Sequence, residues 1–109
     1  MRCVKTELYF GENEPGGKSV KAKAWLDFLK KEVTPRFPRG MTVLDAYGQM
    51  QHHSGRIEHQ DTRVIILVYK AGSAGEKRVG EVIAAYRARF ENAQVMHLRS
   101  TVDAEFFAD

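Results

Sequence analysis

Apolar and polar residues alternate along the first stretch of the chain, from Cys3 to Gly11. Side chains of a β-strand point alternately to its two sides, so this alternation predicts a strand over residues 3–11. One side would carry Val4, Thr6, Leu8 and Phe10, and the other Lys5, Glu7 and Tyr9. The next six residues, E-N-E-P-G-G, contain three turn formers and predict a loop.

Helical periodicity follows from about Ser19 to Val33. Apolar residues recur there at steps of three and four, which predicts an amphipathic helix; they are Val20, Trp25, Phe28, Leu29 and Val33. Pro35 has no backbone N–H and disfavours helical geometry at the residue before it. The helix is therefore expected to end at Thr34 and Pro35, with Thr34 outside helical geometry.

Two strands are predicted next, over residues 41–53 and 63–69. Ser54 and Gly55 fit a two-residue hairpin turn between them, and a longer loop running to Asp61 fits equally well. The two choices give different registers. A shift of one residue moves every side chain to the other face of the sheet. The sequence therefore does not determine which side chains of residues 41–53 point toward the helices.

A second helix is predicted from Ser73 to about Asn92. Ser73 and Glu76 have the spacing of a capping box at its start. The buried stripe of this helix is expected to be Val79, Val82, Ile83, Tyr86 and Phe90. A fourth strand is predicted over residues 94–102.

The order β-α-β-β-α-β predicts an α+β, ferredoxin-like domain spanning residues 1–109. Its four-stranded antiparallel sheet would carry both helices on one face, and right-handed crossovers would put the first and third strands in the centre. The other face would stay uncovered, although the chain is rich in apolar residues. A homodimer is therefore expected, in which two sheets could face each other as a dimeric α/β barrel.

Composition narrows the class of protein. The 109 residues are 43% apolar and 28% charged, which is typical of one globular domain. No apolar run approaches the roughly 20 residues that cross a bilayer, and no secretory signal opens the chain, so a membrane partner is not expected and the chain as it stands is expected to be cytoplasmic. The net charge of +3 comes from interspersed charges, which makes nucleic acid an unlikely partner.

Polar side chains on one strand form the candidate site. Asp45, Tyr47 and Gln49 occur at every second position, so they point to one side. Tyr9, with Glu7, and His97, with Arg99, would join them if all lay on the open face of the sheet. Asp45, Tyr47 and His97 are the catalytic candidates, since a carboxylate, a phenol and an imidazole can exchange protons. A solvated or intersubunit face that merely alternates polar residues is the alternative.

Arg36 lies between two prolines in the corner that follows the first helix. A guanidinium held in this way suits a carboxylate or phosphate, so Arg36 joins Tyr9, Asp45, Tyr47 and Gln49 as a candidate ligand-binding residue. The alternative is structural: Arg36 would bind the last carbonyls of the helix or pair with Asp45.

Three histidines flank the hairpin turn, beside Glu58: His52, His53 and His59. Adjacent residues of a strand point to opposite faces, so at most two of these histidines converge easily, and no metal site is expected. No phosphate loop, nucleophile elbow or dinucleotide fingerprint occurs, so no cofactor is expected.

Two segments carry a family resemblance. T-E-L-Y-F-G (residues 6–11) and V-T-P-R-F-P-R-G-M-T-V-L-D-A-Y-G-Q (residues 33–49) closely resemble motifs of a bacterial domain-of-unknown-function family. The resemblance implies no established activity. Many relatives look exported, with a leader ahead of the first strand, so export is the alternative to a cytoplasmic location if a leader precedes this chain.

Two classes of function follow. The first is a site for a small polar or anionic molecule on the sheet, either in a binding protein or in a cofactor-independent acid–base enzyme. The second is a structural or protein-interaction domain whose open sheet face is only a dimer interface. A cavity lined by Tyr9, Asp45, Tyr47 and Gln49 would favour the first class, and a filled sheet face the second.

Overall fold

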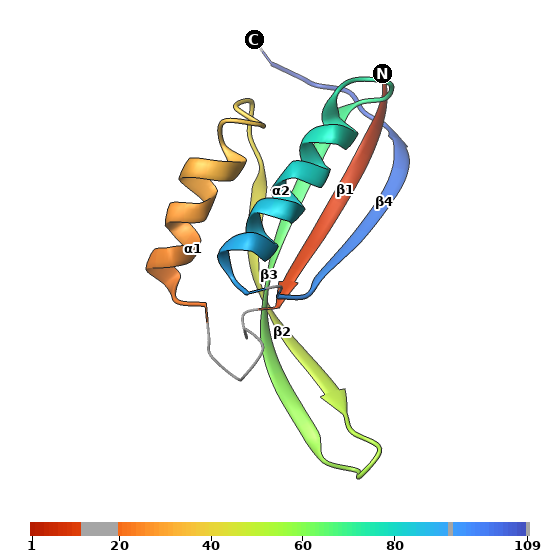
Figure 1. Cartoon of the computed structure of the whole chain (residues 1–109). Coiled ribbons are helices and arrows are strands. Elements are labelled where there is room, and N and C mark those ends of the chain that lie inside the picture. The colour runs from red at the N-terminus through yellow and green to blue at the C-terminus, as the bar shows by residue number, and fades with distance from the viewer. Residues whose placement is uncertain (12–19, 92, 109) are drawn as a thin grey trace.

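The computed structural model describes residues 1–11, 20–91 and 93–108. Its elements run in the predicted order, β-α-β-β-α-β (Figure 1). They are β1 (Arg2–Gly11), α1 (Ala22–Phe28), the π-helical turn η1 (Leu29–Val33), β2 (Thr42–Gln51), β3 (Ile57–Lys70), α2 (Gly75–Arg89) and β4 (Val95–Asp103). The prediction of an α+β, ferredoxin-like fold is confirmed.

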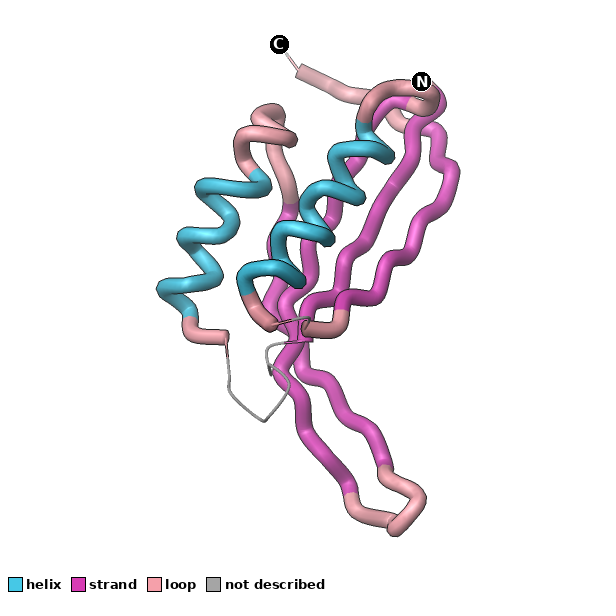
Figure 2. Tube along the Cα trace, in the orientation of Figure 1, coloured by secondary structure: helices cyan, strands magenta, loops and turns pink. Residues whose placement is uncertain are grey.

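The four strands form one antiparallel sheet in the order β2-β3-β1-β4. The prediction that β1 and β3 lie in the centre is confirmed. Both helices lie on the same side of this sheet (Figure 2). We call that side the helix face and the opposite side the open face.

The strand register shows which residues share a face, because directly opposed residues in antiparallel strands point to the same side. Leu8 of β1 lies opposite Ile65 of β3 and His97 of β4, on the helix face. Tyr9, one residue later, lies opposite Val64 and Met96 on the open face. The same parity places every residue of the sheet.

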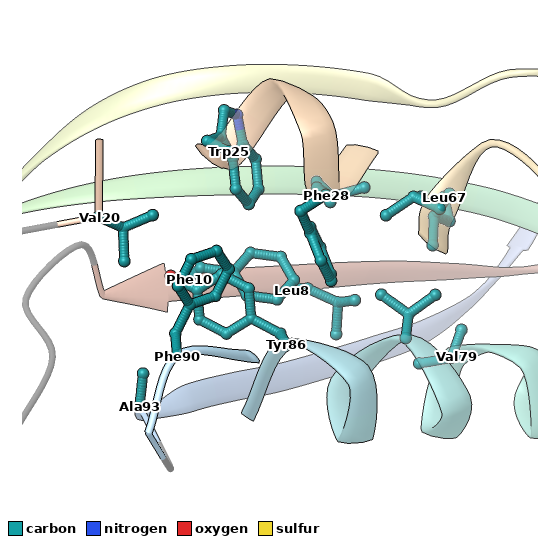
Figure 3. Packing of buried hydrophobic residues seen from close by; sticks show 13 residues of the cluster. Leu8, Phe10, Val20, Trp25, Phe28, Leu67, Val79, Tyr86, Phe90 and Ala93 are labelled. Atoms are coloured by element: carbon teal, nitrogen blue, oxygen red, sulfur yellow. The ribbon is translucent and has the colours of Figure 1, made fainter. Parts of the chain in front are cut away.

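An aromatic core fills the space between the helix face and the two helices (Figure 3). Phe10 of β1 is at its centre, with ring centroids 4.5 Å from Tyr86, 5.4 Å from Trp25 and 6.1 Å from Phe28. Each of these side chains is at most 4% exposed. Burial of one such side chain contributes about 1.5–3 kcal/mol, so this cluster orients both helices on the sheet.

The first helix ends where Pro35 predicts, but its last turn is wider than expected. Leu29–Val33 is π-helical, and the N–H of Thr34 donates to the carbonyl of Leu29 at 2.9 Å. Thr34 itself keeps helical geometry, with φ −56° and ψ −43°. The prediction that Pro35 forces Thr34 out of that geometry was wrong: the clash with the proline ring disfavours helical geometry at the preceding residue but does not forbid it, and the hydrogen bond to Leu29 holds Thr34 there.

The hairpin between β2 and β3 closes over residues 52–56, which is neither the predicted two-residue turn at Ser54 and Gly55 nor a loop to Asp61. Gly55 has a φ of +91°, which favours glycine, and its N–H donates to the carbonyl of His52 at 2.8 Å. β3 consequently starts at Ile57, six residues earlier than predicted. This register pairs Gln49 with His59 and Tyr47 with Asp61.

The predicted capping box at the start of α2 does not form. α2 begins at Gly75 after Ala74, and Oγ of Ser73 accepts from the N–H of Gly75 at 3.3 Å, not from the N–H of Glu76 that a capping box would use. Glu76 instead accepts hydrogen bonds from Tyr69 at 2.7 Å and from Arg99 at 2.6 Å. Two stronger partners from the sheet thus replace the local backbone bond.

The two ends of the described chain lie side by side. The N–H of Ala104, just after β4, donates to the carbonyl of Met1 at 2.8 Å. Beyond it, Phe106 and Phe107 are 91% and 88% exposed. No helix in the described residues is long and apolar enough to cross a membrane.

Candidate functional site

The outer halves of β2 and β3 form a two-stranded arm. β1 ends at Gly11, which lies opposite Thr62, so the strand residues before Thr62 have no third strand beside them. Figure 1 shows this hairpin projecting beyond both helices. We define the arm as residues 47–61. An isolated hairpin of this kind is only marginally stable in water.

Three polar side chains meet on the arm: Tyr47, Gln49 and His59, which we call the arm cluster. The hydroxyl of Tyr47 donates to Oε1 of Gln49 at 2.8 Å and is hydrogen-bonded to Nδ1 of His59. Their rings lie close, with the centroids of Tyr47 and His59 5.2 Å apart. The side chain of Tyr47 is 62% exposed, so the cluster is open to solvent.

One proton arrangement satisfies both bonds of Tyr47. The phenol of Tyr47 has one proton, which it donates in the hydrogen bond to Gln49. In the second hydrogen bond the phenol oxygen is therefore the acceptor, and Nδ1–H of His59 is the donor. Nε2 is then the acceptor atom of the neutral imidazole. The cluster therefore offers a hydroxyl, an amide and an imidazole, with donors and acceptors close together.

Asp45 lies on the same face at the base of the arm. Its carboxylate is 3.8 Å from Nε of Arg63, the residue directly opposite it. Arg63 is anchored in the body of the domain: its Nη1 donates to the carbonyl of Val20 at 3.0 Å, and its guanidinium lies 5.4 Å from the centroid of Trp25. The side chain of Asp45 thus points to the same side of the sheet as those of Tyr47 and Gln49, but its carboxylate is paired with Arg63 and not with the arm cluster.

Tyr9 does not join this cluster. It lies on the open face, where its hydroxyl donates to Glu7 at 3.4 Å, whereas Asp45, Tyr47 and Gln49 lie on the helix side of the sheet. The condition for one shared site, that all these residues lie on the open face, is not met. The register set by the turn at residues 52–56 puts the polar set of β2 on the helix side of the sheet.

Arg36 joins the two helices. Its Nη1 donates to the carbonyl of Glu32 at 2.8 Å and to the carboxylate of Glu32 at 3.0 Å, while its Nε donates to Glu81 of α2 at 3.2 Å. Two carboxylates compensate its charge. The structural alternative, in which Arg36 binds a terminal helix carbonyl, is confirmed; the alternative pairing with Asp45 is not formed, because Asp45 pairs with Arg63.

His97 also lies away from the arm. It is on the helix face of β4, opposite Leu8, and its buried Nε2 has no hydrogen-bond partner among the described residues. His97 therefore does not meet Asp45 or Tyr47, and the three catalytic candidates do not form one acid–base centre.

A second polar cluster lies at the start of α2, and sequence reasoning missed it. Thr6, Tyr69, Glu76 and Arg99 form a continuous chain of hydrogen bonds, which we call the α2 clamp. Thr6 and Tyr69 are 2.9 Å apart, and Glu76 receives bonds from both Tyr69 and Arg99. The parity of Tyr69 with Ile65 and Leu67 is the signal that could have placed its ring on the helix face.

The pKa values of Tyr69 and Glu76 in the α2 clamp are shifted away from neutral pH, the first upward and the second downward. Burial raises the pKa of Tyr69 above its ordinary value of 10.0, and the hydrogen bond to Glu76 raises it further. The hydrogen bond from Tyr69, helped by Arg99, lowers the pKa of Glu76 below 4.5. An acid–base catalyst needs a pKa near the working pH. The α2 clamp instead holds a constant charge at neutral pH, which suits a structural role.

Comparison with known proteins places the chain among uncharacterised relatives. The family model described as "Protein of unknown function (DUF3574)" matches residues 5–106. A search of curated proteins finds no significant match.

Solved structures support the fold. A phage SAM lyase in complex with S-methyl-5'-thioadenosine is 15% identical, with a TM-score of 0.61 over 97% of this chain and 93% of that chain. The de novo designed protein Foldit4 is 14% identical, with a TM-score of 0.56 over 94% and 100%. The GlnK–ATP complex of B. subtilis is 13% identical, with a TM-score of 0.55 over 91% and 82%. At these identities the likeness shows the fold alone.

Proposed function

The chain belongs to the DUF3574 family of proteins of unknown function, and we propose that it binds a small polar molecule at the arm cluster and acts as a homodimer. The hydrogen-bonded group of Tyr47, Gln49 and His59 on an exposed arm carries the proposal. Such groups cost side-chain entropy to hold together, and on a solvent-exposed ribbon they stabilise little. A ligand that forms hydrogen bonds to these pre-arranged side chains would explain why they are held together.

The polar character of the ligand follows from the residues that surround it. Arg36, the expected anchor for an anion, is held by Glu32 and Glu81 away from the arm. Asp45 adds negative charge at the base of the arm. A neutral molecule with hydroxyl, amide or ring-nitrogen groups therefore suits the arm cluster better than a multiply charged anion.

The structural neighbours suggest the first ligands to test. The SAM lyase structure holds S-methyl-5'-thioadenosine, and the GlnK structure holds ATP. Both molecules contain adenosine, whose base offers hydrogen-bonding edges and a flat ring that can stack on a tyrosine. Adenosine and S-methyl-5'-thioadenosine test a neutral ligand, and ATP tests an anionic one.

An acid–base reaction at this site would use Tyr47 and His59. Their direct hydrogen bond joins a phenol to an imidazole, two groups that can each give a proton to a ligand or take one from it. Product analysis by chromatography after incubation with each adenosine compound separates turnover from binding. The site serves binding alone if every compound is recovered unchanged.

Isothermal titration calorimetry with these three compounds tests the binding site. Tyr47→Phe removes one hydroxyl and should weaken binding about 3- to 10-fold, which corresponds to the roughly 0.5–1.5 kcal/mol of one hydrogen bond. His59→Gln should weaken it similarly. Tyr9→Phe is the matched control, since it removes a strand hydroxyl from the opposite face. Equal effects of Tyr47→Phe and Tyr9→Phe would contradict the assignment.

The homodimer rests on the open face, which carries exposed apolar side chains. Light scattering at tens of micromolar tests it directly, and a monomer would contradict it. A stable dimer that binds none of the compounds would favour the alternative, a structural or protein-interaction domain.

A further inference from the structure

The open face is more apolar than an uncovered surface should be. Five of its residues are large, apolar and between 43% and 53% exposed: Leu44, Met50, Val68, Met96 and Leu98. They come from β2, β3 and β4. Exposed apolar patches of this extent mark interaction sites.

Both edge strands carry large apolar residues on the open face, although Val43 of β2 and Val95 of β4 lie on the helix face. In β4, Met96 and Leu98 lie on the open face, while His97 and Arg99 lie on the helix face. β2 shows the same reversal, with Leu44 on the open face. Alternation normally turns the apolar set toward the core. The open face of these edge strands is therefore more apolar than a solvated sheet face usually is.

Two charges lie in the middle of this face. Lys5 and Glu7 occupy the open face of β1, a central strand, and both are partly buried. The row of residues across the sheet at Glu7 contains Ile66 and Leu98, and the row at Lys5 contains Val68 and Ser100. Because these opposite charges are two residues apart on β1, the charge of the open face changes sign along the strand, from Lys5 to Glu7.

We propose that two copies pack open face to open face, with β1 antiparallel to β1 of the partner and the two-fold axis crossing at Thr6. This inference rests on the proposed homodimer and adds its geometry. Glu7 then lies over Lys5 of the partner subunit, and the reverse pair forms by symmetry. An axis parallel to the strands would instead place each charge over its own copy, which costs free energy.

The apolar rows agree with the same axis. The two-fold axis lays the Glu7 row of one subunit over the Lys5 row of the other. Leu98 then lies over Ser100 of the partner subunit, and Ile66 lies over Val68 of the partner subunit. A large residue thus meets a small one at the edge. Interdigitation of this kind gives close packing between sheets that lie about 10 Å apart.

The area is sufficient for a stable dimer. Four strands about 4.8 Å apart and about nine residues long, at about 3.3 Å each, give a face of roughly 20 by 30 Å. A projected area of about 600 Å² corresponds to a larger accessible area, because the face is pleated. A standard interface buries about 800 Å² per partner, so the open face reaches that class.

Charge exchange tests the geometry by sedimentation velocity over a concentration series. Lys5→Glu and Glu7→Lys should each raise the dimer dissociation constant at least about tenfold, because each puts like charges together. The double variant should restore it to within about threefold of the wild type. Lys23→Glu on the exposed side of α1 and Glu105→Lys beyond β4 are the matched controls and should change little. Circular dichroism confirms that each variant is folded.

The outcomes separate this inference from the proposed function. A wild-type chain that is monomeric overturns both the homodimer and its geometry. A wild-type dimer in which neither single variant weakens association, or in which the double variant is as weak as the singles, overturns only the antiparallel arrangement. Ligand binding at the arm cluster is measured independently and depends on neither result.

Discussion

Gly75 lies so close to the ring of Tyr69 that a Cβ at Gly75 would overlap ring atoms Cγ, Cδ2 and Cε2. The first residue of α2 thus rests directly on a side chain of β3. This contact brings Glu76, the next residue, within hydrogen-bond distance of the Tyr69 hydroxyl. The glycine and the tyrosine together set how near α2 approaches the sheet.

Gly75→Ala should therefore destabilise the domain. The new methyl group must displace the Tyr69 ring or lift α2, and overpacking of this kind costs roughly 1–3 kcal/mol. Urea denaturation measures the loss. Gly80→Ala is the matched control, because no atom lies within 4 Å of its added Cβ and alanine is favoured inside a helix by about 0.5–1 kcal/mol. Equal stability of the two variants would contradict the close contact.

Acid should weaken the α2 clamp through Glu76. The hydrogen bond from Tyr69 lowers the pKa of Glu76 in the folded chain, so the unfolded chain binds this proton first as pH falls. The stability that Glu76 contributes is complete above its unfolded pKa of 4.5 and is lost below it, as pH falls through the lowered folded value.

Urea unfolding at pH 7 and at pH 3.5 measures this dependence. The wild type should lose more free energy of unfolding between these pH values than Glu76→Gln, which cannot titrate at this position. Glu91→Gln, an exposed position after α2, should behave like the wild type. Parallel pH profiles for the wild type and Glu76→Gln would show that the clamp does not stabilise the carboxylate.

The elements themselves could be predicted because their periodicity is local. Alternation along β1 and the helical spacing of Trp25 and Phe28 each involve residues within one or two turns of the chain. The predicted core stripes of both helices are buried except for Leu29 and Ile83, which are partly buried. The position of the first helix end was also predictable, since a proline acts on its immediate neighbours.

The face of β2 could not be predicted, because it depends on a turn outside the strand. In addition, the usual assumption that apolar residues face the core points the wrong way here. Leu44 and Met50 lie on the open face, and Tyr47 lies on the helix side. Met50 and Tyr47 lie on the arm, which the helices do not reach, so no core exists there to select the apolar set.

The α2 clamp was invisible for another reason. Thr6 and Tyr69 are 63 residues apart, and Glu76 and Arg99 are 23 residues apart. No spacing rule connects them. Their meeting depends on the pairing of β1 with β3 and on how α2 lies over both, which only the assembled fold defines.

Arg36→Gln should lower stability and leave ligand binding unchanged. The change removes the ion pairs to Glu32 and Glu81, which join the end of the first helix to α2. These groups are partly exposed, so a loss of about 1 kcal/mol is expected. Thermal unfolding measures it, with Arg39→Gln as an exposed control in the same corner. If the folded variant bound an adenosine compound more weakly than the wild type, this prediction would be contradicted, and Arg36 would again be a candidate ligand-binding residue.

Tyr69 and Glu76 should be energetically coupled, which a double-mutant cycle can measure. Tyr69→Phe keeps the ring against Gly75 but removes the hydroxyl that bonds both Thr6 and Glu76. The side chain of Thr6 is fully buried, so its hydroxyl loses its partner without gaining water, and the variant should lose about 1–3 kcal/mol.

Glu76→Gln leaves the phenol and Arg99 without their carboxylate, and it should cost less, because Glu76 is partly exposed. If the clamp acts as one unit, the double variant should be more stable than the sum of the two losses predicts, by about 0.5–1.5 kcal/mol. Urea denaturation of the wild type and the three variants at pH 7 gives this coupling. Additive losses would mean that Tyr69 stabilises the core through Thr6 alone, and that Glu76 binds Arg99 without helping to hold α2 on the sheet.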